Sequence, residues 1–233
     1  MLPLRDKNPS GTFPLVTILL IITNIVVFFY ELMLGERLSI FLNHYALVPA
    51  KVISYGTVPG IEVKYVFLSF FTSMFFHGGW LHIIGNMWYL WIFGDNVEDK
   101  LGHSKFLLFY LICGVIATVA HVFFNPRSTV PVVGASGAIA GVLGAYLISF
   151  PFARIITAVP IFFFITFVEI PAVLLLFFWF VLQFFSGTLS IAATAHTEGG
   201  GVAWWAHVGG FLCGMILITL FSRRKGFRRR RAY

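Results

Sequence analysis

Six long apolar stretches constrain this chain more than any other feature of its sequence. A helix needs about 20 apolar residues to cross a bilayer, and stretches of this kind cover residues 14–30, 65–93, 106–124, 132–150, 171–185 and 202–221. Charged residues make up only 11% of the chain, whereas a soluble domain carries about 25% because its surface must be hydrated. We therefore expect an all-α, multi-pass integral membrane protein, a bundle of six transmembrane helices surrounded by the lipid bilayer.

The fifth stretch is irregular. Residues 155–185 form an apolar run that is broken by Pro160, Glu169 and Pro171, and the run is too long for one straight span. We expect residues 171–185 to cross the membrane. The preceding residues, 155–170, are expected to lie at the membrane interface or to re-enter the bilayer.

The basic residues predict the orientation of the chain. Seven of the sixteen lie between residues 223 and 231, and Arg5 and Lys7 precede the first apolar stretch. An even number of spans puts both termini on one side, and the positive-inside rule makes that side the cytoplasm. We expect a cytoplasmic N-terminal segment (1–13), a membrane domain (14–222) and a basic cytoplasmic tail (223–233).

The position of the tail argues for lipid and against nucleic acid as its partner. It follows an apolar helix directly, as expected for a segment that touches anionic lipid. No cleavable signal peptide is evident, and the compact plan is typical of a bacterial inner (plasma) membrane. Cys113 and Cys213 lie inside apolar stretches, so they predict neither a disulfide framework nor a zinc site. The sequence does not indicate an oligomeric state.

Polar residues at membrane depth are costly and call for a reason. His82 and Asn86 are four residues apart, so they share one face of the second span. Ser136 opens the fourth span, where the positive end of the helix dipole favours an alkoxide or oxyanion, although capping is the commoner role of serine there. His207 opens the sixth span. All three spans are expected to enter the membrane from the outer side, so these residues should lie at similar depth.

Small residues predict how two of these spans pack. Gly137 and Gly141 form a stripe on the fourth span, and Gly210 and Gly214 continue a stripe on the sixth. Small residues at a spacing of four let transmembrane helices approach closely. Packing of the two stripes against each other would make Ser136 and His207 neighbours.

These polar and glycine motifs resemble those of the rhomboid family of intramembrane serine proteases, in order and in spacing. The matching segments are His82-Ile-Ile-Gly-Asn86, Gly134-Ala-Ser136-Gly137 and Ala206-His207-Val-Gly209-Gly210. The likeness covers most of the chain, from about residue 66 to residue 214. One departure is the first outer loop, because residues 35–64 lack the Trp-Arg pair that many members carry there.

The resemblance implies an endopeptidase that cuts single-pass membrane proteins in or near their transmembrane segments. Ser136 would be the nucleophile and His207 the general base. The side chains of His82 and Asn86, with the backbone N–H of Ser136, would form the oxyanion hole. The family needs no metal or other cofactor. No carboxylate is placed to orient the histidine, since nothing ties Glu198 to it.

Other roles stay open at this point. The glycine-rich residues 186–201 could cover the site and Trp179 and Phe180 could form a lateral gate, but a simple connector and lipid-facing packing explain them equally well. His77 is as readily structural as catalytic.

Two other functions compete with proteolysis. A transporter or channel could use His77, His82, His121 and His207 for metal binding or proton relay, although Glu169, in the apolar run 155–185, is the one acidic residue within the apolar stretches. A catalytically inactive relative could bind transmembrane helices without cutting them.

Overall fold

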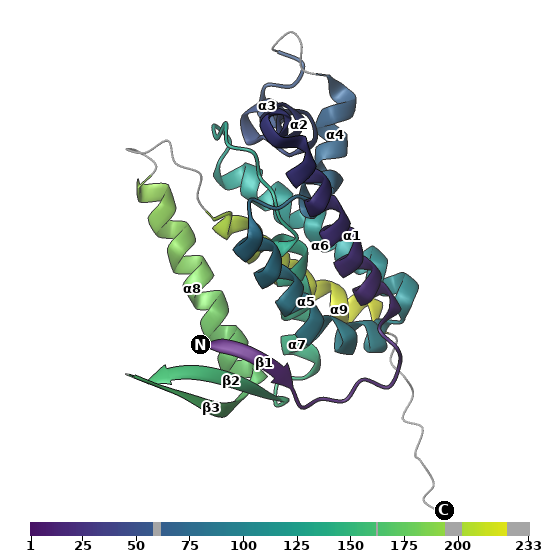
Figure 1. The fold of residues 1–233 in the computed structure, drawn as a ribbon, viewed down its shortest axis with the longest axis vertical. Coiled ribbons are helices and arrows are strands. Elements are labelled where there is room, and N and C mark those ends of the chain that lie inside the picture. Colours follow the sequence, from purple (N-terminus) through teal and green to yellow (C-terminus); the bar gives the residue numbers. More distant parts are fainter. Residues whose placement is uncertain (58–61, 162, 194–201, 223–233) are drawn as a thin grey trace, which may run out of the picture.

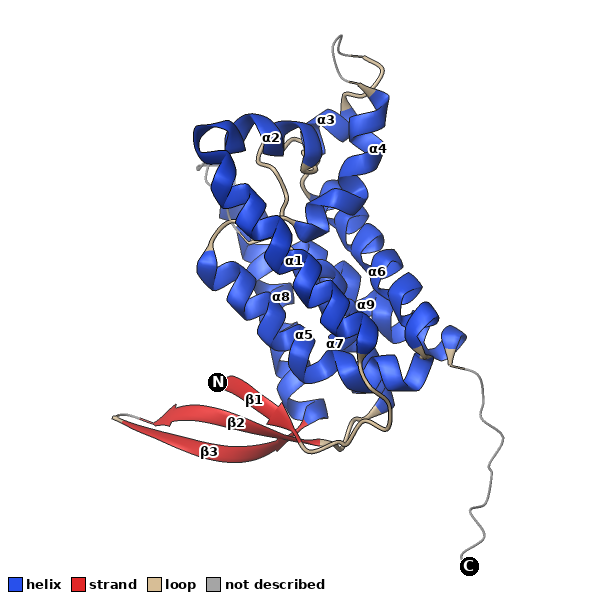
Figure 2. Cartoon of the chain, turned by 45° about the vertical axis from the view of Figure 1, so that its right-hand side comes forward, coloured by secondary structure: helices blue, strands red, loops and turns tan. Residues whose placement is uncertain are grey.

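The computed structural model describes residues 1–57, 62–161, 163–193 and 202–222. A bundle of helices makes up most of this structure, and a small antiparallel sheet lies across one end of it, here called the sheet end (Figures 1 and 2). The helices are α1 (Leu15–Leu34), α2 (Leu38–Tyr45), α3 (Pro49–Ile53), α4 (Val63–Thr72), α5 (Trp80–Leu101), α6 (His103–Phe124), α7 (Ser136–Ser149), α8 (Ala172–Ala193) and α9 (Trp204–Phe221), with 3-10 turns at Gly35–Arg37 and Ser73–Phe75. The strands are β1 (Leu2–Asp6), β2 (Arg154–Ile161) and β3 (Phe164–Pro171).

The helices give four or five candidate membrane spans in the part of the chain that the structure describes. Four are long and apolar enough to cross a bilayer, namely Leu15–Tyr45, His103–Phe124, Ala172–Ser190 and Trp204–Phe221. A fifth arises if α4 and α5, which are bent by 78° relative to each other, count as one broken span. Helix α7 has 14 residues, so it is about 21 Å long, less than the ~30 Å hydrocarbon core. The expected count of six is therefore not confirmed.

The short helix α7 lies at the centre of the bundle. It contacts α5, α6, α8 and α9, and its residues from Gly137 to Tyr146 are all buried. A helix that neighbouring helices surround has no need to match the thickness of the lipid. This explains how a length too short for an independent span is compatible with a central place in a membrane protein.

The expectation of an all-α chain is wrong for two segments. Residues 154–171 form the hairpin β2–β3, which pairs Ile155 with Ile170 and Ile161 with Phe164. The expected N-terminal segment contributes β1, which pairs with β2 in the order β1-β2-β3. Pro160 would interrupt a helix because it has no N–H to donate. The β-branched and aromatic residues that flank it fit an extended strand better.

A buried carboxylate fixes the start of α1. Glu98 lies near the end of α5 and is fully buried. Its oxygens accept hydrogen bonds from the backbone N–H groups of Val16 and Thr17, at 2.8 Å each, and from Thr17 Oγ1 at 2.7 Å. The first N–H groups of a helix have no partner within it, and the helix dipole favours a negative charge there. Helix α5 continues through the polar residues after 95 as far as Leu101.

The two glycine stripes face each other between α7 and α9. A Cβ atom on Gly210 would overlap the carbonyl oxygen of Gly137, and one on Gly214 would overlap that of Gly141. On the other side of α7, a Cβ on Gly137 would lie 2.6 Å from the Cβ of Ala117 in α6. Glycine at these positions lets the helices approach to backbone contact, and α7 accordingly packs more extensively on α9 than on any other element.

Candidate active site

Ser136 and His207 are hydrogen-bonded to each other. Ser136 is the first residue of α7, and His207 lies in the first turn of α9. Ser136 Oγ is 2.8 Å from His207 Nε2. The close packing of α7 on α9 therefore brings together two residues that are 71 positions apart in the sequence.

The other nitrogen of His207 has a partner that sequence reasoning missed. His207 Nδ1 lies 2.7 Å from Oε1 of Gln183, which projects from α8. An amide oxygen only accepts hydrogen bonds, so Nδ1 carries the proton and Nε2 is free to accept one from Ser136. Both side chains are buried, with 8% of each exposed. A polar amide inside the apolar 171–185 stretch was the signal that could have identified Gln183, since intramembrane polar groups are rarely without a function.

His82 lies close to Ser136. The backbone N–H of Gly78 donates to His82 Nδ1 at 3.3 Å, so the ring proton is on Nε2. A Cβ atom on Gly134 would lie 2.8 Å from that Nε2 and 3.5 Å from Ser136 Oγ. The backbone of Gly134, with a φ of 127°, also favours glycine. Any other residue there would push the imidazole away from the serine.

Two further donors, from Asn86 and from the backbone of Ser136, belong to residues that line the same cavity. Asn86 follows His82 by one turn of α5 and is buried, and its Nδ2 has no hydrogen-bond partner among the residues that the structure describes. The backbone N–H of Ser136 lies in the first turn of α7, where the helix offers it no acceptor. A buried donor without an acceptor is costly. Such donors suit a site that receives negative charge during a reaction.

These side chains line one large cavity of about 1020 Å³. It lies among α5, α6, α7, α8 and α9, and its polar lining residues include His82, Asn86, His121, Ser136, Gln183 and His207. Its volume is at the upper end of the range, roughly 300–1,000 Å³, of sites that bind small molecules. Ser136, His207 and the candidate donors therefore border a space large enough for a bound ligand.

The sequence of the chain also matches a known protein family. A family model of the rhomboid domain matches residues 65–224, which include every residue of the site.

The chain belongs to the rhomboid family.

Relatives of this rhomboid chain come from several compartments. It is 29% identical over 180 residues to Rhomboid-like protein 11, chloroplastic, of Arabidopsis thaliana, covering 71% of this chain and 59% of that protein. It is 32% identical over 155 residues to the mitochondrial Presenilin-associated rhomboid-like protein A of Danio rerio, covering 63% and 35%. It is 42% identical over 76 residues to Rhomboid protease GluP of Bacillus subtilis, covering 33% and 14%.

The family and the apolar helices make this chain an integral, multi-pass membrane protein. The chain spans less than two thirds of the length of each of these relatives. Their names include chloroplastic and mitochondrial proteins, so the comparisons do not support the predicted bacterial inner membrane.

His77 lies behind the candidate oxyanion donors of this rhomboid. Its ring packs edge-on against His82, with the centroids 5.2 Å apart. Its backbone N–H donates to the buried carboxylate of Glu31 in α1, at 3.1 and 3.3 Å to the two oxygens. These contacts indicate a structural role, in which Glu31 holds the turn between α4 and α5. The sequence did not predict this carboxylate contact.

The histidines do not form a metal site. No group of three or more His, Cys, Asp or Glu side chains is placed to hold a metal ion within residues 1–57, 62–161, 163–193 and 202–222. His121, in α6, lines the same large cavity as His82 and His207.

The structure describes only some of the residues that could control access to the cavity, namely Trp179, Phe180 and part of 186–201. Trp179 lines the cavity, and its ring lies 5.9 Å from that of His207. Phe180 stacks on Phe211 of α9 at 4.9 Å. Glu198 and the three glycines at 199–201 lie outside the described residues.

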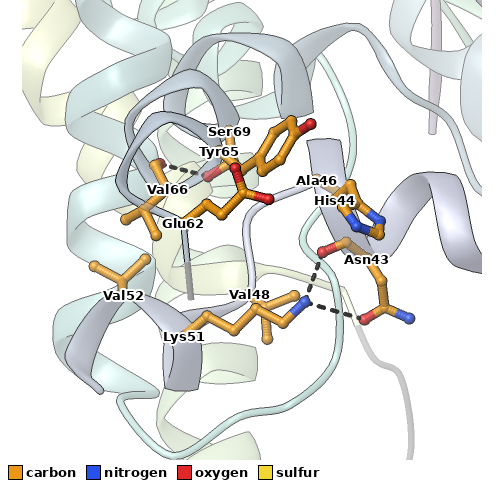
Figure 3. Close-up of a pocket in the computed structure, with 10 residues that line it drawn as sticks. All are labelled: Asn43, His44, Ala46, Val48, Lys51, Val52, Glu62, Tyr65, Val66 and Ser69. Carbon is orange, nitrogen blue, oxygen red and sulfur yellow. Dashed lines mark hydrogen bonds between the residues drawn. The ribbon is translucent and has the colours of Figure 1, made fainter. Parts of the chain in front are cut away.

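A second pocket lies elsewhere in the molecule. It is a hollow of about 110 Å³ among α2, α3 and α4, and it shares no lining residue with the large cavity (Figure 3). Lys51 closes it by donating from Nζ to the backbone oxygen of Asn43 at 2.6 Å. This hydrogen bond connects α3 to α2, the two short helices between α1 and α4.

Proposed function

We propose that this rhomboid chain is an intramembrane serine endopeptidase. Its substrates would be single-pass membrane proteins, cut in or near their transmembrane segments. The observation that carries the proposal is the 2.8 Å contact between Ser136 Oγ and His207 Nε2, beside a large cavity with buried donors. Membership of the family and the name of the relative GluP, a rhomboid protease, favour the same function.

The proposed first step forms an acyl-enzyme. Ser136 Oγ attacks the carbonyl carbon of the scissile peptide bond while its proton passes to His207 Nε2. The imidazolium that forms is held through Nδ1–H by the amide oxygen of Gln183, 2.7 Å away. His207 then gives the proton to the leaving amine as the C–N bond breaks. Gln183 here takes the place that a carboxylate has in a serine triad, without adding a charge to the site.

The oxyanion of the tetrahedral intermediate would accept three hydrogen bonds. The donors are Nε2–H of His82, Nδ2–H of Asn86 and the backbone N–H of Ser136. Removing one donor of an oxyanion hole typically lowers the rate about 10²- to 10³-fold. In the second step His207 takes a proton from water, and the water oxygen attacks the acyl carbon. The bond from that carbon to Ser136 Oγ then breaks, His207 returns the proton to Oγ, and the carboxylic acid leaves. No metal or organic cofactor takes part in this scheme.

The substrate must present an extended peptide to the serine. The carbonyl groups of an α-helix are hydrogen-bonded within the helix, so a transmembrane substrate has to unwind locally before attack. We expect small or helix-breaking residues near the cut. The volume of about 1020 Å³ next to Ser136 accommodates such an unwound segment.

We place the sheet end in the cytoplasm. Arg5, Lys7, Lys105 and Arg154 lie at this end, and Lys105 Nζ donates to the last carbonyl oxygen of α9, at Phe221. The seven basic residues of 223–231 follow directly. The positive-inside rule then puts both termini in the cytoplasm and the site toward the opposite side of the membrane. The comparisons do not identify the membrane itself.

A cleavage assay tests the proposal. The purified full-length protein in liposomes is mixed with a tagged single-span substrate, with and without a chelator. We expect cleavage by the wild type, none by Ser136→Ala or His207→Ala, and no effect of the chelator. Ser149→Ala, a serine at the far end of α7, is the matched control and should cut normally.

Two results would contradict the proposal. Cleavage that persists in Ser136→Ala would exclude this serine as the nucleophile. Binding of the substrate without cleavage, across several substrates, would instead favour an inactive relative that holds transmembrane helices.

A further inference from the structure

The β2–β3 hairpin is fixed to the start of a candidate membrane span. Strand β3 ends at Pro171 and α8 begins at the next residue. The backbone N–H of Ala172 donates to the oxygen of Ala153 at 2.9 Å, and that of Val173 donates to Pro151 at 2.8 Å. The base of the hairpin therefore lies at the boundary where α8 enters the membrane.

The far end of the hairpin projects away from the protein. The strands run across the sheet end of the bundle, and Figure 2 shows them extending sideways beyond the helices. Each strand has eight residues, so the hairpin is about 26 Å long. A hairpin that begins at the membrane boundary and runs sideways lies over the lipid that surrounds the helices.

The projecting end is apolar and exposed. We define the hairpin tip as the large apolar residues on both strands and in the turn whose side chains are at least half exposed. They are Ile161 (50%), Phe163 (98%), Phe164 (78%), Ile165 (68%) and Phe167 (66%). Proteins in water rarely expose a contiguous apolar patch of this kind unless another apolar phase covers it.

The base of the hairpin has the opposite character. Arg154 opens β2, and the ammonium of Lys7 forms an ion pair with Glu169 of β3. Arg5 pairs in register with Ile156, the residue that also pairs with Glu169. Basic residues beside an apolar, aromatic-rich surface are the pattern of elements that lie in an anionic membrane interface.

We propose that the hairpin tip inserts into the boundary between headgroups and acyl chains of the protein's own membrane, beside α8 at the sheet end. The hydrocarbon core itself is unfavourable, because the outer edges of β1 and β3 carry backbone groups without partners in the sheet, and these need water or headgroups. A shallow position satisfies both the edges and the phenylalanines. This inference depends on the membrane location of the chain and not on its proteolytic activity.

Fluorescence quenching tests the depth of the tip. An environment-sensitive probe is attached to Phe163→Cys in the full chain, with Cys113 and Cys213 replaced by alanine and the fold checked by thermal unfolding. Ser104→Cys, an exposed position in the first turn of α6 at the same end, is the matched control. Both are reconstituted in vesicles of phosphatidylcholine alone or mixed with phosphatidylglycerol.

We expect nitroxide groups near the top of the acyl chains to quench the Phe163 probe more strongly than the Ser104 probe, and aqueous iodide to quench it several-fold less. The protection from iodide should increase with phosphatidylglycerol. Equal iodide quenching of the two probes, with no quenching by the lipid nitroxides, would overturn the proposal. Protection that appears only at high protein density, again without nitroxide quenching, would also overturn it and assign the tip to a contact between copies.

Discussion

The hydrogen bond from His207 to Gln183 makes a quantitative prediction. Replacing Gln183 with methionine preserves the volume of the side chain and removes the acceptor 2.7 Å from Nδ1. Because both side chains are buried, the N–H of the histidine is then left without a partner, which costs about 1–3 kcal/mol. The cost is larger by about 1–2 kcal/mol in the transition state, where the imidazole is charged, because hydrogen bonds of charged groups are stronger than neutral ones. Only this difference lowers kcat, so we expect kcat to fall about 5- to 30-fold, since each 1.4 kcal/mol is a factor of ten.

The assay compares kcat and KM for a single-span substrate in liposomes. KM should change little, because Gln183 acts on the histidine and not on bound substrate in our scheme. Gln183→Glu keeps an acceptor oxygen at the same place and should recover most of the lost activity. Phe184→Leu, which alters the exposed side of α8, serves as the control for changes in the helix.

A purely structural role for Gln183 predicts a different pattern. Both Gln183 variants would then lose thermal stability and activity together. Our reasoning is refuted if Gln183→Met cuts within about twofold of the wild type, or if Gln183→Glu is as inactive as Gln183→Met while both unfold at the wild-type temperature.

Three further predictions concern stability. Gly214→Ala should lower the free energy of unfolding by about 1–3 kcal/mol through overpacking, because its Cβ would overlap a carbonyl oxygen of α7. Gly85→Ala, with open space around it, should be neutral or stabilising. Equal losses in thermal unfolding would contradict the packing argument. Glu98→Gln should destabilise the protein by roughly 1.5–3 kcal/mol, which is the contribution of a hydrogen bond to a charged acceptor. Unfolding by denaturant measures this loss, and an unchanged midpoint of the unfolding transition would show that the carboxylate is dispensable. Burial raises the pKa of Asp6 from 3.8 to about 6. Its stabilising contribution is therefore full below pH 3.8 and is lost as the pH rises through about 6. Asp6→Asn should remove this pH dependence from thermal unfolding, and an identical pH profile in the variant would exclude Asp6 as its source.

The sequence predicted the helical core because two independent patterns agreed there. Apolar stretches located the candidate spans, and the glycine stripes indicated which helices approach closely. The structure accordingly brings Ser136 within hydrogen-bonding distance of His207. Sequence spacing along one helix also placed His82 and Asn86 on the same face, toward the same cavity.

Other features were beyond the reach of these patterns. An apolar run such as 155–170 has the same composition in a membrane helix and in an interfacial hairpin, so hydropathy alone could not identify β2 and β3. Glu98 lies in a polar segment of the sequence, and Glu31 directly follows the apolar stretch 14–30. Exposure is the normal expectation for a carboxylate at either position. Their burial depends on the ends of distant helices and turns, which supply the backbone donors. Gln183 pairs with a residue 24 positions away, a contact that no local spacing encodes.

The central claim is that His207 activates Ser136 as a nucleophile, and a fluorophosphonate probe tests it most directly. Ser136 Oγ would displace fluoride from phosphorus and give a covalent adduct, which mass spectrometry of the intact protein and its peptides locates. The account predicts one adduct, on Ser136, which is absent in Ser136→Ala and nearly absent in His207→Ala although both variants are folded. An adduct on another serine, or labelling of Ser136 at the wild-type rate in His207→Ala, would contradict it.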